Sequence, residues 1–431
     1  MKNMISDPYR KSRAFYCIEA TLEYLIAILV GETYLAKIAK ELGASDALTG
    51  VLYSFVSLGC AFQIISVFLS GKTPVKRWAT ALHIINQLFF TFVYAVPLLD
   101  LSGEVKLIFF VAMLLLGQIL NNVVNPIKIH WFMALVDDKK RGRFTANKEM
   151  ISLITGMIFS FAMGNVIDYF SERGEMRTAF IVGCVTMFCL TVLHTLTLIF
   201  SKEKPVPKKN EKLGETLRLL LKNKMLFRVI GVSVLWYIVN YMTAPFYGSY
   251  KIGALGFSMT FCSVLAIITS VVRTCFSRPI GKYADRHGFA KMLMICFSVK
   301  GLSLLMAAFA GPANGQVMFI LYSALAAIAM AGINSAQINL IYDYVEPEQR
   351  MSALALSHAI SGVVGFLTTL AVTPLVNAVQ ANGNQVLGIT VYPQQILSAL
   401  GVVGILGLLI YILLLLKPFQ KHKKTEQGEE E

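Results

Sequence analysis

Residues 106–136 read KLIFFVAMLLLGQILNNVVNPIKIHWFMALV, and this stretch decides the class of fold. An α-helix rises 1.5 Å per residue, so a helix of this length crosses the hydrocarbon core of a bilayer, which is about 30 Å thick. The stretch lacks the short alternation of apolar and polar residues that marks a membrane β-strand. A helix satisfies its own backbone hydrogen bonds inside lipid, so we predict a membrane-spanning helix here.

Segments of the same kind recur along the whole chain of 431 residues, which is 56% hydrophobic and 15% charged. A soluble chain carries about a quarter charged residues. The sequence therefore predicts an all-α membrane protein with twelve transmembrane helices. We expect these helices over residues 14–37, 46–70, 77–97, 106–136, 149–169, 178–200, 226–249, 257–279, 289–310, 316–345, 351–377 and 394–416.

The basic residues indicate the orientation in the membrane. With both termini in the cytoplasm, the inner segments and adjoining helix ends hold 30 of the 39 Lys and Arg, and the outer loops hold six. This bias predicts a multi-pass protein of the plasma membrane with both termini cytoplasmic. Contact with anionic lipid explains the net charge of +14, so we expect the lipid bilayer as a partner and no nucleic acid. All seven cysteines fall within spans without a Cys-x-x-Cys pair, which favours neither disulfides nor a metal site.

The two halves of the chain resemble each other. An offset of 209 residues places Asn125 on Asn334 and Arg141 on Arg350 without a gap. The offset preserves helix order, which predicts two pseudo-symmetric six-helix bundles, residues 1–200 and 226–431, with a cytoplasmic tail at the end. Between them lies a charged linker, 201–225, whose part from Leu213 to Leu226 is either an amphipathic surface helix or a flexible connection.

A short motif between the eighth and ninth expected helices carries a family resemblance. It reads GKYADRHGFAK over residues 281–291, a pattern of glycine, acid, base, glycine and base. In this the chain resembles the transporters of the major facilitator superfamily. The resemblance implies alternating access, and a gating loop that latches the outward-open state; a generic basic turn is the alternative. The candidate gating residues, with the basic residues of the two repeat-related inner loops, are Gly281, Asp285, Arg286, Gly288, Lys291, Arg141 and Arg350.

The sequence also departs from the family pattern. The corresponding loop of the first half, residues 71–77, has no acidic residue, so gating is expected to be asymmetric. The fourth span lacks the arginine of many proton-coupled members. The fifth span reads GMIFSFAMG over 156–164, without the Gly-Pro motif of drug–proton antiporters. These departures disfavour a multidrug exporter.

Charged residues inside spans are costly and indicate function. Glu19 and Glu23 lie four residues apart, on one face of the first span, and Lys128 lies at a similar depth in the fourth span. In this family the first, fourth, seventh and tenth helices line the cavity. We therefore expect an ion pair of Glu23 with Lys128 that exchanges with a proton or with substrate. His130 is either a proton relay or an ordinary hydrogen-bonded residue.

Neutral polar residues occupy the remaining cavity positions that the family implies. Such a lining suits a sugar, a nucleoside or another polar organic solute, although Asn and Gln also hydrogen bond between helices. The candidates are Asn121, Asn125, Trp236, Tyr237, Asn240, Asn334 and Gln337. Four ionisable residues near span ends or isolated in the sequence are expected simply to meet solvent. These are Glu32, His83, Asp168 and His194.

These observations predict a secondary transporter that moves a small polar solute with protons, works as a monomer and needs no cofactor. Two alternatives remain: an antiporter exporting drugs or lipids, and a receptor or scaffold on the same fold that transports nothing. An enzyme is disfavoured because the sequence has no phosphate-binding loop, zinc spacing or serine nucleophile motif.

Overall fold

The structure is a computed structural model that describes residues 7–70, 74–137, 141–204, 213–343, 345–346, 349–386 and 388–416. Within these residues, 11 helices are long and apolar enough to cross a membrane, and one bent helix pair raises the number to 12. The prediction of twelve spans is thereby confirmed.

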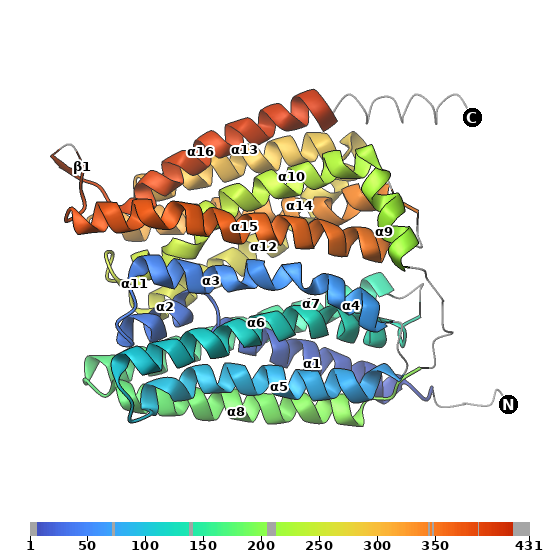
Figure 1. Cartoon of the computed structure of the whole chain (residues 1–431), viewed down its shortest axis with the longest axis horizontal. Helices are drawn as coiled ribbons and strands as arrows, with labels where there is room; N and C mark the ends of the chain where they lie inside the picture. Colours follow the sequence, from blue (N-terminus) through green and yellow to red (C-terminus); the bar gives the residue numbers. More distant parts are fainter. Residues whose placement is uncertain are drawn as a thin grey trace. The chain divides into compact units, whose positions relative to one another are not determined.

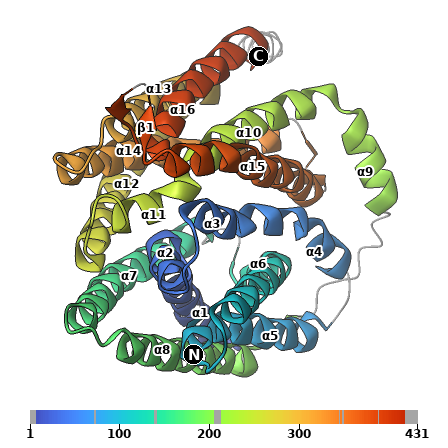
Figure 2. The same ribbon diagram turned by 60° about the vertical axis from the view of Figure 1, so that its left-hand side comes forward.

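Contacts divide the chain into two compact units. Unit 1 comprises Met1–Ser45, Phe62–Glu211 and Ser258–Ser263. In this unit α1 packs against α7 and α8, and α5 packs against α6 and α8, as Figures 1 and 2 show. The helices of unit 1 are α1 (Arg10–Leu29), α2 (Glu32–Glu41), α4 (Gln63–Ser70), α5 (Val75–Ala95), η1 (Val96–Leu98), α6 (Gly103–Met133), α7 (Arg141–Glu172) and α8 (Met176–Phe200).

Unit 2 comprises Asp46–Ala61, Lys212–Phe257 and Val264–Glu431. Its core lies among α10, α13, α14 and α16. The elements of unit 2 are α3 (Asp46–Ala61), α9 (Leu213–Lys222), α10 (Lys224–Thr243), η3 (Ala244–Phe246), α11 (Tyr247–Ile252), α12 (Met259–His287, whose first turn belongs to unit 1), α13 (Phe289–Ala308), α14 (Gly315–Asp343), α15 (Arg350–Ala381), the strands β1 (Gln385–Val386) and β2 (Ile389–Thr390), α16 (Pro393–Tyr411) and η5 (Ile412–Leu416).

The second span, α3, belongs by its contacts to unit 2, where it packs along α15. Ser57 Oγ donates a hydrogen bond to the carbonyl of Gly362 at 2.8 Å. A Cβ atom at Gly362 or Gly365 would overlap atoms of α3, so the close approach of these two helices requires glycine. The two units defined by contacts therefore do not coincide with the two halves of the sequence. The division into residues 1–200 and 226–431 is based on the sequence repeat, and it stays a prediction.

The first span is bent, whereas the sequence predicted one continuous helix. The pair α1 and α2 meets at an angle of 41°. Gly31 stands between them with extended backbone angles (φ −82°, ψ 175°), and its carbonyl accepts the first hydrogen bond of α2, from the amide of Leu35 at 2.8 Å. A Cβ atom at Gly31 would lie only 3.0 Å from the carbonyl oxygens of Ala27 and Ile28, so the break falls at a position that has little room for a side chain.

The inner segment 280–288, which was expected to be a loop, is largely helical. Helix α12 continues to His287, so Gly281 and Asp285 lie inside a helix and not in a loop. The turn comes instead at Gly288, whose φ of 85° favours glycine. In the linker, α9 forms a helix; its action at the membrane surface stays a prediction. The sequence did not predict the small hairpin in which Gln385 pairs with Thr390 and Val386 with Ile389.

Asp168, near the end of α7, holds the first turn of α12. Its two carboxylate oxygens accept hydrogen bonds from the backbone N–H of Met259 at 2.8 Å and of Thr260 at 2.7 Å. The hydroxyl of Ser258 accepts from the N–H of Phe261 at 3.0 Å. Three N–H groups that a helix start leaves unpaired are therefore satisfied. The expectation that Asp168 merely meets solvent was wrong, because the sequence does not show that a distant helix begins beside it.

We predict that Asp168→Ala lowers the free energy of unfolding by about 1 kcal/mol, the usual cost of losing a helix cap. Asp168→Asn keeps one acceptor and should lose less. Unfolding of the purified protein in detergent micelles measures both changes, with Glu172→Ala, an exposed acidic residue on the same helix, as the control. Equal stability of Asp168→Ala and the parent protein would contradict this account.

Candidate functional site

Two carboxylates and one lysine meet inside unit 1. Glu19 and Glu23 lie one turn apart on α1, and Lys128 on α6 reaches both of them. The Nζ of Lys128 lies 2.9 Å from Oε1 of Glu19 and also donates a hydrogen bond to Oε2 of Glu23. The side chains of Lys128 and Glu19 are 2% and 4% exposed, whereas that of Glu23 is 17% exposed. The structure therefore places Glu23 and Lys128 in contact, as the sequence predicted. Glu19 is a second carboxylate in contact with the same lysine.

Two histidines that the sequence interpretation left to solvent complete the cluster. His83 on α5 and His194 on α8 are 1% and 0% exposed. His194 Nε2 lies 3.1 Å from Glu19 Oε1 and 3.7 Å from Glu23 Oε2. His83 Nδ1 lies 3.5 Å from Lys128 Nζ, and the two imidazole rings meet edge to face with centroids 4.1 Å apart. The expectation for both histidines was wrong, because their helices turn these faces inward. We call Glu19, Glu23, Lys128, His83 and His194 the charged cluster.

Helix packing fixes the positions of these side chains. The Asn86 amide, one turn beyond His83, donates to the carbonyl of Gly117 at 2.6 Å. A Cβ atom at Gly117 would overlap the ring of Phe90, so α5 and α6 approach closely at this glycine. The hydroxyl of Tyr94 donates to the carbonyl of Leu29 at 2.7 Å and ties α5 to α1. Small residues and hydrogen bonds thus bring the four helices of the cluster together.

Aromatic rings close the inner end of the cluster. Tyr16 stacks on Phe132 with ring centroids 4.6 Å apart, and Trp131 stacks on Phe132 at 4.7 Å. Tyr16 precedes Glu19 by one turn of α1, and Trp131 follows Lys128 by one turn of α6, so the stack covers the charges from the cytoplasmic side of the expected topology. The indole N–H of Trp131 donates to the carbonyl of Lys202 at 3.1 Å. The charged groups therefore lie in a region of low dielectric constant, where an unbalanced charge is costly.

The other predicted residues of unit 1 lie outside the cluster. Asn121 and Asn125 on α6 are half-buried, and their side chains form no hydrogen bond with any residue that the structure describes. His130 is exposed, so the structure does not bring it to the carboxylates as a relay would require. Its position follows from helix geometry, because two residues after Lys128 a side chain points to another face of α6.

In unit 2 the predicted residues separate into two groups. Trp236 is buried, and its ring packs on Phe297 with centroids 5.6 Å apart, so it belongs to the core of the unit rather than to a polar lining. Lys300, for which the sequence offered no partner, donates to the hydroxyl of Tyr322 at 3.4 Å, and its ammonium lies 5.9 Å from the Trp236 ring. The second group is half-buried and comprises Tyr237, Asn240, Asn334 and Gln337.

Amides of this second group have spare hydrogen-bonding capacity. The Nε2 atom of Gln337 is buried without a partner among the described residues. The side chains of Asn240 and Asn334 likewise form no hydrogen bond with the described part of the chain. Buried amides normally find partners, so these groups are available to a polar ligand or to water.

The candidate gating residues are only partly assembled. Asp285, Arg286 and Lys291 are exposed and form no ion pair within the described ranges. Asp285 lies in the last turn of α12. Arg350 donates to the carbonyl of Tyr342 at 3.4 Å and lies over its ring at 4.9 Å. Arg141 begins α7, and its side chain lies outside the described part of the structure. The latch itself stays a prediction.

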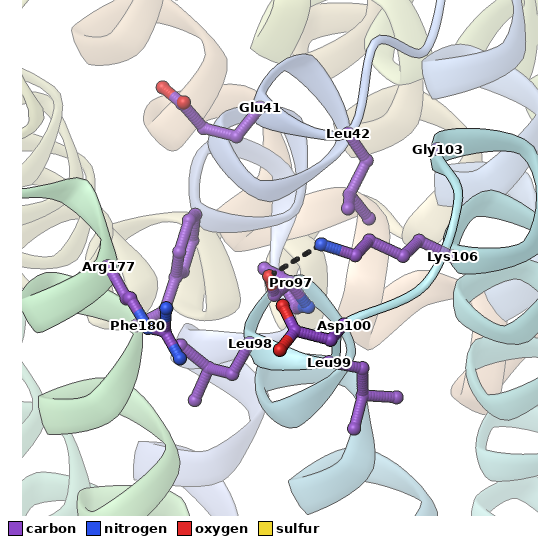
Figure 3. A pocket seen from close by; sticks show the side chains of 10 residues that line it. All are labelled: Glu41, Leu42, Pro97, Leu98, Leu99, Asp100, Gly103, Lys106, Arg177 and Phe180. Atoms are coloured by element: carbon purple, nitrogen blue, oxygen red, sulfur yellow. Dashed lines mark hydrogen bonds between the residues drawn. The ribbon is translucent and has the colours of Figure 1, made fainter.

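Two further features of unit 1 bear on ligands. Glu19, Glu23 and His194 offer metal-ligand atoms within 4.8 Å of one another, but the ammonium of Lys128 already lies between the two carboxylates as a positive charge. A separate cavity of about 310 Å³ opens at the far ends of α2, α5 and α8 (Figure 3). Lys106 reaches across it to the carbonyl of Pro97 at 3.2 Å. This cavity contains no member of the charged cluster and none of the predicted site residues.

The fold and the buried charges define a polytopic membrane transporter. The family model of the Major Facilitator Superfamily matches residues 16–278 and 237–431, and the chain belongs to this family. Transport, and not an enzymatic reaction, is therefore its activity.

Solved structures show the same fold at low sequence identity. The nucleoside transporter NupG has a TM-score of 0.69 at 16% identity and covers 93% of this chain and 98% of its own. A D-xylose-proton symporter reaches 0.65 at 15% identity, over 92% and 97%. An auto-inhibited peptide transporter of the POT family reaches 0.67 at 12% identity, over 93% and 96%. No curated protein matches the chain.

We predict that Lys128→Met is strongly destabilising, because it leaves two carboxylates side by side without their counter-ion. Removing one partner of a buried ion pair costs about 3–5 kcal/mol. The double variant Lys128→Met with Glu19→Gln should recover part of this loss, because one negative charge is removed as well. Unfolding free energies of the parent, the two single variants and the double variant measure the coupling. Additive losses would show that the ion pair does not contribute to the fold.

Proposed function

We propose that the protein is a secondary active transporter that moves a small polar organic solute by alternating access and couples this movement to protons. The charged cluster is the observation that carries the proposal. Five ionisable side chains from four helices converge in the apolar interior of unit 1, and the ion pairs and hydrogen bonds between them fix their positions. Such groups are costly inside a membrane protein and mark ion or substrate pathways.

The charge balance of the cluster favours proton coupling. With both carboxylates ionised, Lys128 protonated and both imidazoles neutral, the cluster has a net charge of −1. A low dielectric constant penalises that excess charge. One additional proton neutralises it. A transport cycle that alternates between these two charge states would bind and release one proton each time a solute is moved.

Glu23 is the member of the cluster best placed to exchange that proton with water or with solute. Its side chain is 17% exposed, whereas those of Glu19 and Lys128 are nearly inaccessible. Protonation of Glu23 weakens its attraction for Lys128 and leaves the ammonium paired with Glu19. The ion pair can therefore rearrange without leaving a buried charge unpaired, which is the condition for a low-cost switch.

The half-buried amides support a polar solute. Asn121 and Asn125 in unit 1, and Asn240, Asn334 and Gln337 in unit 2, offer both donors and acceptors. Hydroxyls and ring nitrogens of sugars and nucleosides match such groups, and two of the structural relatives are a nucleoside transporter and a D-xylose-proton symporter. We propose the same broad class of solute here. We also propose that an inner gate is formed by the candidate gating residues Gly281, Asp285, Arg286, Gly288, Lys291, Arg141 and Arg350.

The main test is uptake into proteoliposomes. A panel of radiolabelled nucleosides, monosaccharides and dipeptides is offered with and without an inward proton gradient. The proposal expects gradient-driven accumulation of at least one solute. Failure of every solute to move would favour a receptor or scaffold, and outward extrusion of lipophilic compounds would favour an efflux antiporter.

We predict that Glu23→Gln abolishes accumulation driven by the proton gradient, because the variant cannot gain and lose the coupling proton. Expression should stay intact, because Gln keeps the size of the side chain and a hydrogen bond to Lys128. Initial uptake rates against external pH measure the effect, with the exposed outer-end variant Glu172→Gln as the matched control. Normal pH-dependent uptake by Glu23→Gln would rule out this role.

A further inference from the structure

His83 and His194 each retain one ring nitrogen that no contact explains. Among the described residues, Nε2 of His83 and Nδ1 of His194 are buried without a hydrogen-bond partner. Both side chains are almost completely inaccessible to solvent. Buried polar atoms without partners are rare in folded proteins, and they often belong to a functional group or to a bound water.

The opposite ring nitrogens determine what these two atoms offer. The ammonium of Lys128 can only donate, so Nδ1 of His83 accepts, and the hydrogen of a neutral His83 ring lies on Nε2. Glu19 is the counter-ion of Lys128, and its carboxylate can only accept. Nε2 of His194 therefore carries a hydrogen, and Nδ1 of a neutral His194 is left with a bare lone pair.

The two unexplained atoms are therefore complementary. His83 offers an unused donor and His194 an unused acceptor, on rings whose centroids are 4.1 Å apart at an interplanar angle of 67°. The rings are in contact, so a rotation of one ring or one bridging water would be needed to join the two atoms. The resulting chain runs from Lys128 through His83 and His194 to Glu19, and its two outer links are already formed at 3.5 and 3.1 Å.

We infer that His83 and His194 form a buried relay that delivers the coupling proton to Glu19, within the carboxylate pair whose other member, Glu23, exchanges it with water or solute; this inference rests on the proposed function. When the Lys128 ammonium moves off Nδ1 of His83 and stays paired with the carboxylates, hydronium or a water chain protonates that nitrogen. His83 releases its Nε2 hydrogen to Nδ1 of His194, which passes its own Nε2 hydrogen to Oε1 of Glu19. One proton enters and one reaches the carboxylate, while both imidazoles remain neutral in the opposite tautomer.

The surroundings of the relay contain few other ionisable groups. On α1 these are Glu19, Glu23, Tyr16 and Cys17, and on α6 the only group in contact is Lys128. From α7, Lys148 lies 4.9 Å from the Tyr16 ring centroid, and Glu149 acts on the same tyrosine. Within the described residues neither histidine forms an ion pair with α7. The carboxylates and Lys128 are therefore the charged groups that contact the relay.

The first experiment reads the tautomers of the unmodified protein. Nitrogen-15 NMR of histidine-labelled protein in lipid nanodiscs distinguishes protonated from bare ring nitrogens, and single substitutions assign the signals. At alkaline pH the relay requires a hydrogen on Nε2 of His83 and on Nε2 of His194. A hydrogen on Nδ1 of either ring would overturn the inference, and this test needs neither a solute nor a variant that folds poorly.

The second experiment measures delivery of the proton. Time-resolved infrared spectroscopy after a pH jump follows the carbonyl band of protonated Glu19, which Glu19→Gln identifies. We predict that His83→Gln slows the appearance of this band by about 10²-fold, the usual contribution of a positioned acid–base group. Glutamine fills the site and can form one hydrogen bond but cannot relay a proton, so a purely structural role of His83 would be rescued.

His130→Gln, on the exposed face of α6, is the matched control and should leave the rate unchanged. Thermal stability of each variant in detergent verifies folding, and His194→Gln repeats the test from the other ring. Glu19 protonation at the parent rate in His83→Gln would overturn the relay. If proton-driven uptake also persisted in His83→Gln, the relay would be wrong but the proposed function would stand. The proposed function is tested separately by the loss of coupling in Glu23→Gln.

Discussion

The ammonium of Lys128, held between two carboxylates inside an apolar helical bundle, is the constraint from which the rest of the site follows. A single charge there would have to be neutralised or exposed to water, and the aromatic stack of Tyr16, Phe132 and Trp131 separates it from the inner end of the bundle. Only an arrangement that brings α1 to α6 satisfies it. Because α5 packs on α6 and α8 packs on α1, the inward-facing polar residues of α5 and α8 must also join this network. His83 and His194 are the residues that do so.

The sequence predicted much of this arrangement, because the relevant signals are local. Long apolar stretches determine the twelve spans, and a spacing of four residues is enough to place Glu19 and Glu23 on one helix face. The match in depth between these residues and Lys128 follows from counting residues from the inner ends. These inferences need no knowledge of how one helix packs against another.

The burial of His83 and His194 was not predicted from local signals of this kind. Helix α8 is apolar around most of its circumference, so the sequence does not indicate which face points to a neighbour. On α5, Thr80, His83 and Gln87 lie at helical spacing, and this polar stripe is the buried face. A usable signal was nevertheless present, because His83 and His194 lie at a depth close to that of Lys128 when counted from the inner helix ends. Asp168 and the segment 281–288 were misjudged for a related reason. The start of α12 beside Asp168, and the continuation of α12 to His287, depend on tertiary contacts and on Gly288 rather than on local composition.

The location of the ionisable groups restricts how a transport cycle can be coupled. All five members of the charged cluster belong to unit 1, and their contacts are made within it. The candidate solute-binding groups of unit 2 are an aromatic hydroxyl and neutral amides, which do not change charge near neutral pH. A change in protonation therefore alters the electrostatic free energy of unit 1 and leaves these groups of unit 2 unaffected. If the protein couples solute to protons, the coupling energy must pass through the balance among Glu19, Glu23 and Lys128. A neutral polar solute can influence that balance by hydrogen bonding to the partly exposed Glu23 or by changing how Lys128 is shared between the two carboxylates.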